Sequence, residues 1–418
     1  MRKLLVVCGV MIGWLTAYGQ SKTLYIDPDK TTGAPASRVF EEMQFIPLQT
    51  TKKSIFGAIR QLVVTKDYFV VLDGDTDALY FFSKKGAFIY KYKIKRFRIQ
   101  NIQLDHSKNA LLIFSQNKNY TIPSVKIQQY LEPDSKKDVS RYVKATYFFL
   151  DNVPAAKTQD IKNFRYAFTN PVLFDTDRFA TSFIKAKKNS RDTLDYQLKI
   201  INQTTQLHSY FPYNKQSESA FYFAGAAQCT IMPTHNDSVL FVTRPFRYQI
   251  YTLTPSVLKE SYKLILPIEN AIPASFFSAN FQSRGEMDTY KMEHASYASQ
   301  IDNVIRFNNL IFFNLRLFNG YKRYIFNSKL DLIYDYNKIS TDSATCYLPL
   351  YGTTIKGFDE NYIYLSLSAK SVLNAKKNIQ NRTPQCTNGA LNQFLQTGKG
   401  TDNPVLIRLK PKKDQQGE

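Results

Sequence analysis

The sequence predicts an all-β fold, and three observations lead to that prediction. Phe and Tyr dominate the aromatic residues, with 31 and 28 copies against a single Trp, and both are enriched in strands. Short runs of apolar or alternating residues are separated by Asp, Asn, Lys, Ser and Gly, which is the pattern of strands joined by turns. Long amphipathic helical patterns are nearly absent, and the best helical candidate is the segment 286–300.

The segment 62–93, LVVTKDYFVVLDGDTDALYFFSKKGAFIYKYK, contains the unit from which the fold is built. Strands are expected at 59–64, 68–72, 79–82 and 88–92, with tight polar turns between them. The run 68–72 is continuously apolar, as expected for a strand that is covered on both faces. Four strands in about 35 residues form a sheet of the size of one blade of a β-propeller.

This unit recurs in degenerate form along the chain. Further copies are found at 99–114, at 170–185 with 195–201 and 208–213, at 228–253 with 257–266, at 303–336, and at 353–368 with 404–410. The last copy lacks an obvious fourth strand, which TLYID (23–27) or QFIPL (44–48) could supply. A ring closed in this way has no long open edge. The sequence therefore predicts a six-bladed β-propeller with four-stranded antiparallel blades, closed by an N-terminal strand.

Residues 1–19 have the pattern of a signal peptide. Two basic residues precede an apolar run at 4–15 that is too short to span a bilayer comfortably. Ala17 and Gly19 then place small residues where a signal peptidase reads them, so cleavage is expected after Gly19. The alternative is a lipoprotein anchored at Cys8, but this cysteine lies inside the apolar run and follows a valine.

An exported protein, periplasmic or extracellular, is the expectation from this leader, because no later segment has the length of a membrane helix. Residues 20–418 are expected to form a single domain. Polar loop insertions are expected near 132–141, 275–300 and 368–403, the last with a short helix near 391–395. The second and third insertions are expected at the mouth of the central channel.

Three cysteines follow the leader, namely Cys229, Cys346 and Cys386. A chain of this length can bury a large core without disulfide bonds. In an oxidising compartment a bridge between Cys346 and Cys386 is one prediction. Three free and mostly buried thiols are the alternative.

The acidic residues of the first unit resemble the start of a calcium-binding loop. Asp73, Asp75 and Asp77 alternate, but the sixth position is Ala78 where a Gly is needed, and the twelfth is Lys84 where a Glu is needed. A turn between two strands explains these acids better. No calcium site is predicted.

Recognisable catalytic and metal-binding motifs are absent from the sequence. The four histidines, His106, His208, His235 and His294, have no zinc-like spacing and are expected in turns or on the surface. The nucleophile elbow, the Walker loop and the zinc-protease motif are all missing. The sequence therefore predicts no catalytic residue, no metal and no cofactor, although a ring fold can bring distant residues together in its channel.

The densest positive charge lies just after the first unit, in the cluster Lys91, Lys93, Lys95, Arg96 and Arg98. Strand alternation places the three lysines on one face and their apolar neighbours on the other. One interpretation is a cationic rim that binds an anionic ligand. The other is a strand edge that lysines protect from pairing with a second chain.

The formal net charge of +21 falls by two when the leader is removed. Basic charge with aromatic residues can indicate nucleic-acid binding, but an exported protein seldom meets nucleic acid. Anionic polysaccharide or an envelope protein is therefore the expected partner, and no nucleic acid is expected.

The chain resembles exported six-bladed β-propeller proteins of Gram-negative bacteria, most of which have no assigned function. The resemblance is carried by FIPLQTTKKSIFGAIRQLVV (45–64), by the hairpin within 62–93, whose pattern is similar to the Asn-His-Leu type of repeat, and by TDNPVLIRLK (401–410). Such proteins commonly have a glycine-rich segment between the first two blades. Here the segment 91–101, KYKIKRFRIQN, contains no glycine.

Two functions of different classes follow from these observations. The first is a non-catalytic envelope protein that binds a ligand or a protein, with Tyr and Phe as stacking surfaces. The second is a carbohydrate hydrolase, a lactonase or a lyase that uses carboxylates lining the channel. The fold supports both enzymes and binding modules, and the missing motifs favour the first.

Overall fold

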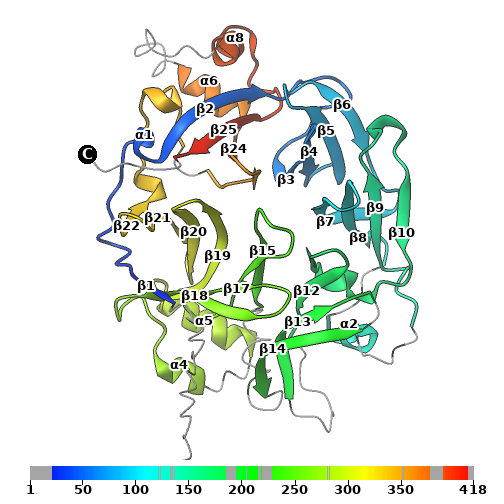
Figure 1. Cartoon of the computed structure of the whole chain (residues 1–418), viewed down its shortest axis with the longest axis vertical. Coiled ribbons are helices and arrows are strands. Elements are labelled where there is room, and N and C mark those ends of the chain that lie inside the picture. Colours follow the sequence, from blue (N-terminus) through cyan, green and yellow to red (C-terminus); the bar gives the residue numbers. More distant parts are fainter. Residues whose placement is uncertain are drawn as a thin grey trace, which may run out of the picture.

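In the computed structural model, the strands form six antiparallel sheets arranged as blades around a common centre (Figure 1). The structure describes residues 21–120, 122, 124–131, 135, 137–184, 194–203, 205–214, 218, 228–279, 281, 283–350, 353–376 and 389–412. Five of the sheets contain four strands, and the fourth blade contains a fifth strand that runs parallel to its neighbour. The predicted six-bladed propeller is therefore confirmed.

The blades follow the chain in order, and the first strand of each blade lies nearest the centre (Figure 1). Blade one consists of β3 (Ile59–Val64), β4 (Tyr68–Asp73), β5 (Ala78–Ser83) and β6 (Phe88–Tyr92). Blade two consists of β7 (Phe97–Asp105), β8 (Ala110–Asn117), β9 (Val143–Phe149) and β10 (Thr158–Ile161). Blade three consists of β11 (Val172–Phe174), β12 (Arg178–Ser182), β13 (Leu194–Ile201) and β14 (Gln206–Asn214).

Blades four to six are built in the same way, with two N-terminal strands added to them. Blade four consists of β15 (Thr230–Pro233), β16 (Leu240–Thr243), β17 (Gln249–Leu253), β18 (Leu258–Ile265) and β1 (Lys22–Tyr25). Blade five consists of β19 (Ala298–Phe307), β20 (Leu310–Leu317), β21 (Tyr321–Asn327) and β22 (Leu332–Asp335). Blade six consists of β23 (Gly357–Phe358), β24 (Ile363–Leu367), β25 (Val405–Pro411) and β2 (Phe40–Pro47).

The apolar strands of blade one show why their sequence lacks polar alternation. Phe69 and Val71 of β4 pack toward blade six, in a cluster that includes Tyr364. Val70 and Leu72, the intervening residues, pack toward blade two in a separate cluster. Because successive side chains point to opposite faces, a blade between two other blades must be apolar on both faces.

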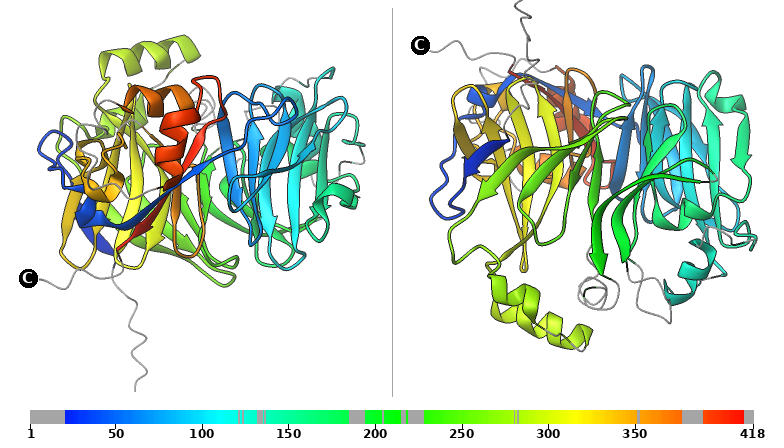
Figure 2. Two further views of the ribbon diagram at one scale, coloured as in Figure 1. Left: turned by 90° about the horizontal axis from the view of Figure 1, so that it is seen from above. Right: turned by 60° about the horizontal axis from the view of Figure 1, so that its bottom comes forward.

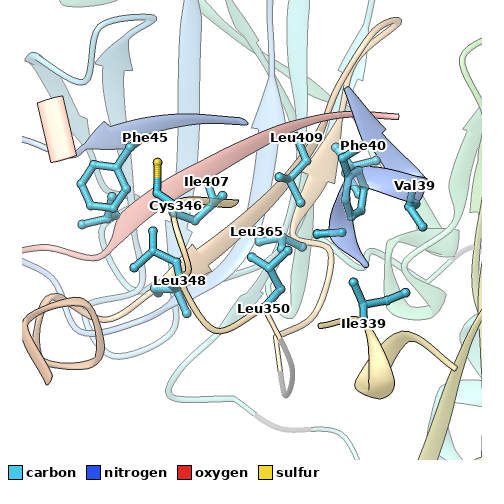
Figure 3. Close-up of a cluster of buried hydrophobic side chains, with 14 of the residues drawn as sticks. Val39, Phe40, Phe45, Ile339, Cys346, Leu348, Leu350, Leu365, Ile407 and Leu409 are labelled. Carbon is cyan, nitrogen blue, oxygen red and sulfur yellow. The ribbon is translucent and has the colours of Figure 1, made fainter. Parts of the chain in front are cut away.

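The ring is closed by β2, which pairs antiparallel with the C-terminal strand β25. Phe45 lies opposite Ile407 in this pairing, and its ring contacts Phe394 at a centroid distance of 5.8 Å. Figure 3 shows Phe45 and Ile407 beside Leu348 in the core of blade six. Of the two candidate closing strands, the QFIPL segment therefore completes the sixth blade.

The other candidate, TLYID, extends blade four instead. As β1 it pairs parallel with β18, the outermost of the four consecutive strands of that blade. Between β1 and β2 the chain forms bridges from Thr32 to Tyr334 and from Pro35 to Ser340, both on blade five. The N-terminal segment 22–47 thus crosses the outer edges of three successive blades.

Helices lie outside the sheets. They are α1 (Ala36–Val39), α2 (Ser124–Leu131), α4 (Ala274–Ser278), α5 (Arg284–Glu293), α6 (Ala369–Asn374) and α8 (Gly389–Thr397), with 3-10 turns at Val153–Ala155, Arg165–Thr169, Tyr336–Lys338 and Ser343–Thr345. Figure 2 shows α4 and α5 projecting beyond the blades. Within the described ranges no helix combines the length and the apolarity that crossing a membrane requires.

The helix predicted at 286–300 is present but shorter at its C-terminal end. The hydroxyl of Ser283 accepts a hydrogen bond from the backbone N–H of Glu286, which fixes the start of α5. The end differs from the prediction because Ala298 already belongs to β19. The short helix predicted near 391–395 lies within α8, which packs against β2 (Figure 1).

Candidate functional site

A cavity of about 750 Å³ lies at the centre of the ring and is lined by the first strand of every blade. The turns that follow these strands in blades one, two, four and six contribute to its rim. A volume of this size is within the range of small-molecule binding sites. None of the described residues of the insertions expected at the channel mouth, 275–300 and 368–403, lines this cavity.

Two glutamine side chains connect the inner strands of the first three blades. Gln61 accepts a hydrogen bond from the N–H of Ile102 (3.0 Å) and donates one to the carbonyl of the same residue (2.6 Å). Gln103 repeats this one blade further, accepting from Leu173 N–H (2.6 Å) and donating to the carbonyl of Pro171 (2.7 Å). Each amide thus satisfies backbone groups that have no strand partner across the gap between blades.

Blades six and one approach each other more closely, through backbone contacts. The N–H of Leu62 donates to the carbonyl of Lys356 at 3.3 Å. A Cβ atom at Gly357 would lie 2.7 Å from the carbonyl oxygen of Leu62. Glycine is therefore required where β23 passes β3, and it positions Lys356 in the wall of the cavity.

His106 and Asp237 meet at the rim of the cavity. Nδ1 of His106 lies 2.8 and 2.9 Å from the two carboxylate oxygens of Asp237. The pair connects the turn after β7 in blade two to the turn after β15 in blade four. It spans blade three, where Asp175 donates its backbone N–H to the carbonyl of Asp237.

His235 is a second histidine at the rim. Its Nε2 donates to the carbonyl of Arg306 at 3.0 Å, and its ring packs edge-on against Phe307 and Phe358, at centroid distances of 4.6 and 4.9 Å. Desolvation of the ring lowers the pKa of His235, although the residue as a whole remains exposed. The neutral imidazole is therefore favoured near pH 7.

The carboxylate of Asp359 is occupied by its own turn. It accepts hydrogen bonds from the N–H groups of Asn361 and Tyr362, both at 3.0 Å, and from the hydroxyl of Tyr364 at 2.6 Å. Burial and this carboxylate raise the pKa of Tyr364. Asp359 thus fixes the turn between β23 and β24, while Glu360 next to it is exposed at the rim.

Two partly buried lysines also line the cavity, and they differ in their surroundings. Burial lowers the pKa of both Lys84 and Lys356. Nζ of Lys84 lies 4.7 Å from the centre of the Phe69 ring, and the negative charge of Asp359 opposes the effect of burial. For Lys356, burial is the whole cause, and none of the residues described forms a side-chain hydrogen bond or ion pair with it.

The predicted basic cluster does not line this cavity; it runs from the outer strand of blade one through the loop to blade two, and ends with Arg98 at the start of β7. Lys91, Lys93 and Lys95 are exposed, and the intervening Tyr90, Tyr92 and Ile94 pack toward the core, as strand alternation requires. No residue of the cluster lines the cavity. Its role in anion binding remains a prediction.

The two arginines of the cluster take part in local structure. Arg96 has a positive φ of 66° in the loop to β7. Arg98 pairs with Asp77 at 3.1 Å, and Lys118 pairs with the same carboxylate at 2.7 Å. Burial opposes ionisation of Asp77, but the hydrogen bond from Lys118 and the charge of Arg98 hold its pKa below the usual value.

The acidic turn of the first unit is stabilised by hydrogen bonds between its own residues. The carboxylate of Asp73 accepts from both the N–H and the hydroxyl of Thr76, at 2.8 and 2.7 Å. Asp77 adopts a positive φ of 53°. Across the described ranges, no three His, Cys, Asp or Glu residues gather as metal ligands would.

The remaining predicted positions are placed as follows. His208 is exposed on β14, and His294 stacks on Tyr290 at 4.1 Å, both away from the cavity. Cys229 is a free, buried thiol. Cys346 is disulfide-bonded; Cys386, its predicted partner, lies outside the described residues, as does the leader 1–19.

The fold and this cavity define a six-bladed β-propeller with a central, ligand-sized site. Residues 18–170 match the family model DUF5128, described as a 6-bladed beta-propeller. The match agrees with the expected resemblance to six-bladed propeller proteins, while the Asn-His-Leu type of repeat stays a prediction. No match was found among curated proteins.

Among solved structures, the chain is similar to a Bacteroides fragilis protein that is thought to be exported. The two are 15% identical with a TM-score of 0.63, over 94% of this chain and 100% of that one. A member of the DUF4221 family from Bacteroides vulgatus is 7% identical with a TM-score of 0.45, over 90% and 97% of the two chains. A streptogramin B lyase is 10% identical with a TM-score of 0.35, over 90% and 100%. At 15% identity the likeness to the Bacteroides fragilis protein shows the fold and not the function.

Proposed function

We propose that this protein is an exported binding module of the bacterial envelope that holds a ligand in its central cavity without transforming it. The cavity itself is the observation that carries this proposal. It is lined by all six blades, and its walls are held by the amide bridges of Gln61 and Gln103. Such a wall is organised before any ligand arrives, which lowers the entropic cost of binding.

Export is supported by the leader and by the description of the Bacteroides fragilis protein with the same fold. Mass analysis of the exported protein tests it directly. A chain that starts at Gln20 and carries no lipid is expected. A chain that keeps Trp14, or one that is acylated at Cys8, would contradict this part of the proposal.

The competing function, a hydrolase, lactonase or lyase, needs free carboxylates in the cavity. Three carboxylates line it in the described structure, those of Asp237, Asp359 and Glu360. Asp237 is paired with His106, and Asp359 is held by three hydrogen bonds within its own turn. These partners give both carboxylates a structural role at the rim. The third carboxylate, that of Glu360, is exposed at the rim, and a single carboxylate does not make the pair that glycoside hydrolysis typically uses.

A single tryptophan provides a direct test of binding. The only Trp of the chain, Trp14, lies in the predicted leader, so a chain starting at Gln20 has none. Asn361 is exposed at the rim and its side chain forms no hydrogen bond in the described structure, so Asn361→Trp places a reporter beside the cavity. Lys53→Trp, exposed in the turn between β2 and β3 and outside both the cavity and the basic cluster, is the matched control.

A panel of neutral and acidic saccharides is titrated into both variants. Fluorescence of the Asn361→Trp protein is expected to change at a saturable concentration, while that of the Lys53→Trp protein stays constant. Chromatography of the recovered saccharide should show it unchanged. Equal responses of the two reporters, or a shortened or oxidised saccharide, would argue against a non-catalytic central site.

A further inference from the structure

We propose that the central cavity binds its ligand through a carboxylate, with the ammonium group of Lys356 as the counter-charge. This inference rests on the proposed function of the cavity and adds the chemical class of the ligand. It begins from the position of Lys356, which directly precedes β23, the inner strand of blade six. The backbone of this residue is fixed by hydrogen bonds to both neighbouring strands, β3 and β24.

The surroundings of Lys356 leave its charge uncompensated. Within the described residues its side chain has no hydrogen-bond partner and no ion pair, and burial is the only effect acting on its pKa. A partly buried ammonium without a partner costs free energy, because it loses water and gains nothing in exchange. A ligand anion at this position would supply the missing partner.

The other cations near the cavity do not share this property. Lys84 lies over the ring of Phe69 and is within the field of Asp359. Lys66 is exposed in the turn after β3. The structure therefore offers one desolvated and unpaired positive charge among the described lining residues.

One such charge suits an anion with a single negative charge. No arginine is among the described residues that line the cavity, and phosphate groups are typically held by several donors or by a guanidinium group. A carboxylate matches a single ammonium. Asn101 and Asn303, on the inner strands of blades two and five, also line the cavity. Their side-chain amides can donate to and accept from the hydroxyl groups of a sugar acid.

Three probes with the same ring separate carboxylate recognition from other chemistry. D-glucuronate carries a carboxylate, its methyl ester is uncharged, and glucose 6-phosphate carries a phosphate. Each is titrated against the Asn361→Trp reporter. The glucuronate is expected to bind at least tenfold more tightly than either of the other two.

Substitutions at position 356 test the counter-charge. In the reporter background, Lys356→Met should reduce glucuronate affinity at least tenfold, whereas Lys356→Arg should retain most of it. Lys53→Met, at an exposed lysine outside both the cavity and the basic cluster, is the control and should leave affinity unchanged. Without ligand, Lys356→Met should raise the melting temperature, because it removes an uncompensated charge.

The outcomes separate this inference from the proposed function. If the ester or the phosphate binds as well as glucuronate, the cavity is a binding site but the carboxylate assignment is wrong. If glucuronate binds equally to the Lys356→Met protein, the counter-charge is wrong. If none of the three probes nor any saccharide of the panel changes the reporter, the proposed central site itself is wrong.

Discussion

Lysines in the cavity wall and lysines on the outer edge of blade one differ in what surrounds them. Lys91, Lys93 and Lys95 are close together in sequence and form the most conspicuous charge feature of the chain, yet all are exposed to water. Lys356 is isolated in sequence, but it is partly buried in the cavity wall. The solvation of a cation, rather than the local density of charge, therefore indicates where binding an anion would release the most free energy.

The outer strands differ among themselves in a related way. In blade six, β2 is covered by α8, and Phe45 is 3% exposed. In blade one, β6 is the last strand, and its Ile89 is 38% exposed. The same position in the blade is therefore part of the core in one case and part of the surface in the other.

Replacing Phe45 with Ala should give the largest effect on stability. It removes a buried ring from the strand that closes the propeller, at an expected cost of about 3–5 kcal/mol. Ile89→Ala on β6 is the matched change and should cost no more than roughly 0.5 kcal/mol. Chemical denaturation of both variants measures the free energy of unfolding. Equal losses of stability in the two variants would show that the closing strand β2 contributes no more to stability than the outer strand β6.

Replacing Gly357 with Ala should have the next largest effect. The added Cβ would lie 2.7 Å from the carbonyl oxygen of Leu62, so β23 and β3 must separate. A strain of about 1–3 kcal/mol is expected, together with weaker binding at the reporter because Lys356 moves. Gly389→Ala is the control, because a Cβ added there would meet open space. Gly320→Ala would not serve, because Gly320 has a φ of 95° and any side chain there would be strained. An unaltered denaturation midpoint for Gly357→Ala would refute the close approach.

The architecture could be predicted from sequence because its signals are local. Blade one was recognisable because residues such as Val70 and Val71 are apolar in succession, which reflects burial on both faces of a blade. The choice between the two closing strands was not local. Both TLYID and QFIPL are strands, and only the partner, β18 or β25, distinguishes them.

The candidate site was much less accessible to sequence reasoning. Gln61, Gln103 and Lys356 look ordinary in the sequence. Their roles depend on neighbouring blades meeting at their inner strands, and on Lys356 directly preceding β23 in the cavity wall. His106 and His235 were correctly expected in turns, but their sequence context does not show that these turns meet at one rim. One sequence signal could have shown it. Both histidines follow the first strand of a repeat unit, and these turns of different blades lie at the same end of the ring.

Lowering the pH should destabilise the rim through His235. Packing against Phe307 and Phe358 lowers the pKa of this histidine in the folded protein relative to its usual value near 6.5. As the pH falls below that value, the unfolded chain takes up the proton more readily than the folded one, so stability decreases. Asp359 and Glu360 oppose this effect, and the net change is therefore small.

The measurement compares melting temperatures of the wild type and His235→Phe between about pH 7.5 and pH 5. The variant keeps an aromatic ring and removes the titrating group, so its melting temperature should fall less over this interval. Parallel curves for the two proteins would show that His235 contributes nothing to the pH dependence.

The smallest effect on stability is expected from the outer lysines, and it decides whether their charge has a function. Replacing Lys91, Lys93 and Lys95 together by Gln should change stability by no more than roughly 0.5 kcal/mol, because exposed substitutions rarely do more. If the cluster binds anionic polysaccharide, the triple variant should bind it more weakly. Binding by the wild type should also weaken steeply with salt, since exposed charges are screened over about 10 Å at roughly 0.1 M ionic strength.

If the lysines only protect the edge of β6, polysaccharide binding should be unaffected by the triple replacement, and the variant should aggregate more readily. Light scattering and binding to an acidic polysaccharide, each measured across a salt series, distinguish the two roles. The glucuronate titration of the Asn361→Trp reporter is the internal control. It should be the same with and without the three lysines, because none of them lines the cavity. A loss of glucuronate binding in the triple variant would mean that the outer edge and the central site are coupled, and the contrast between the two regions would then fail.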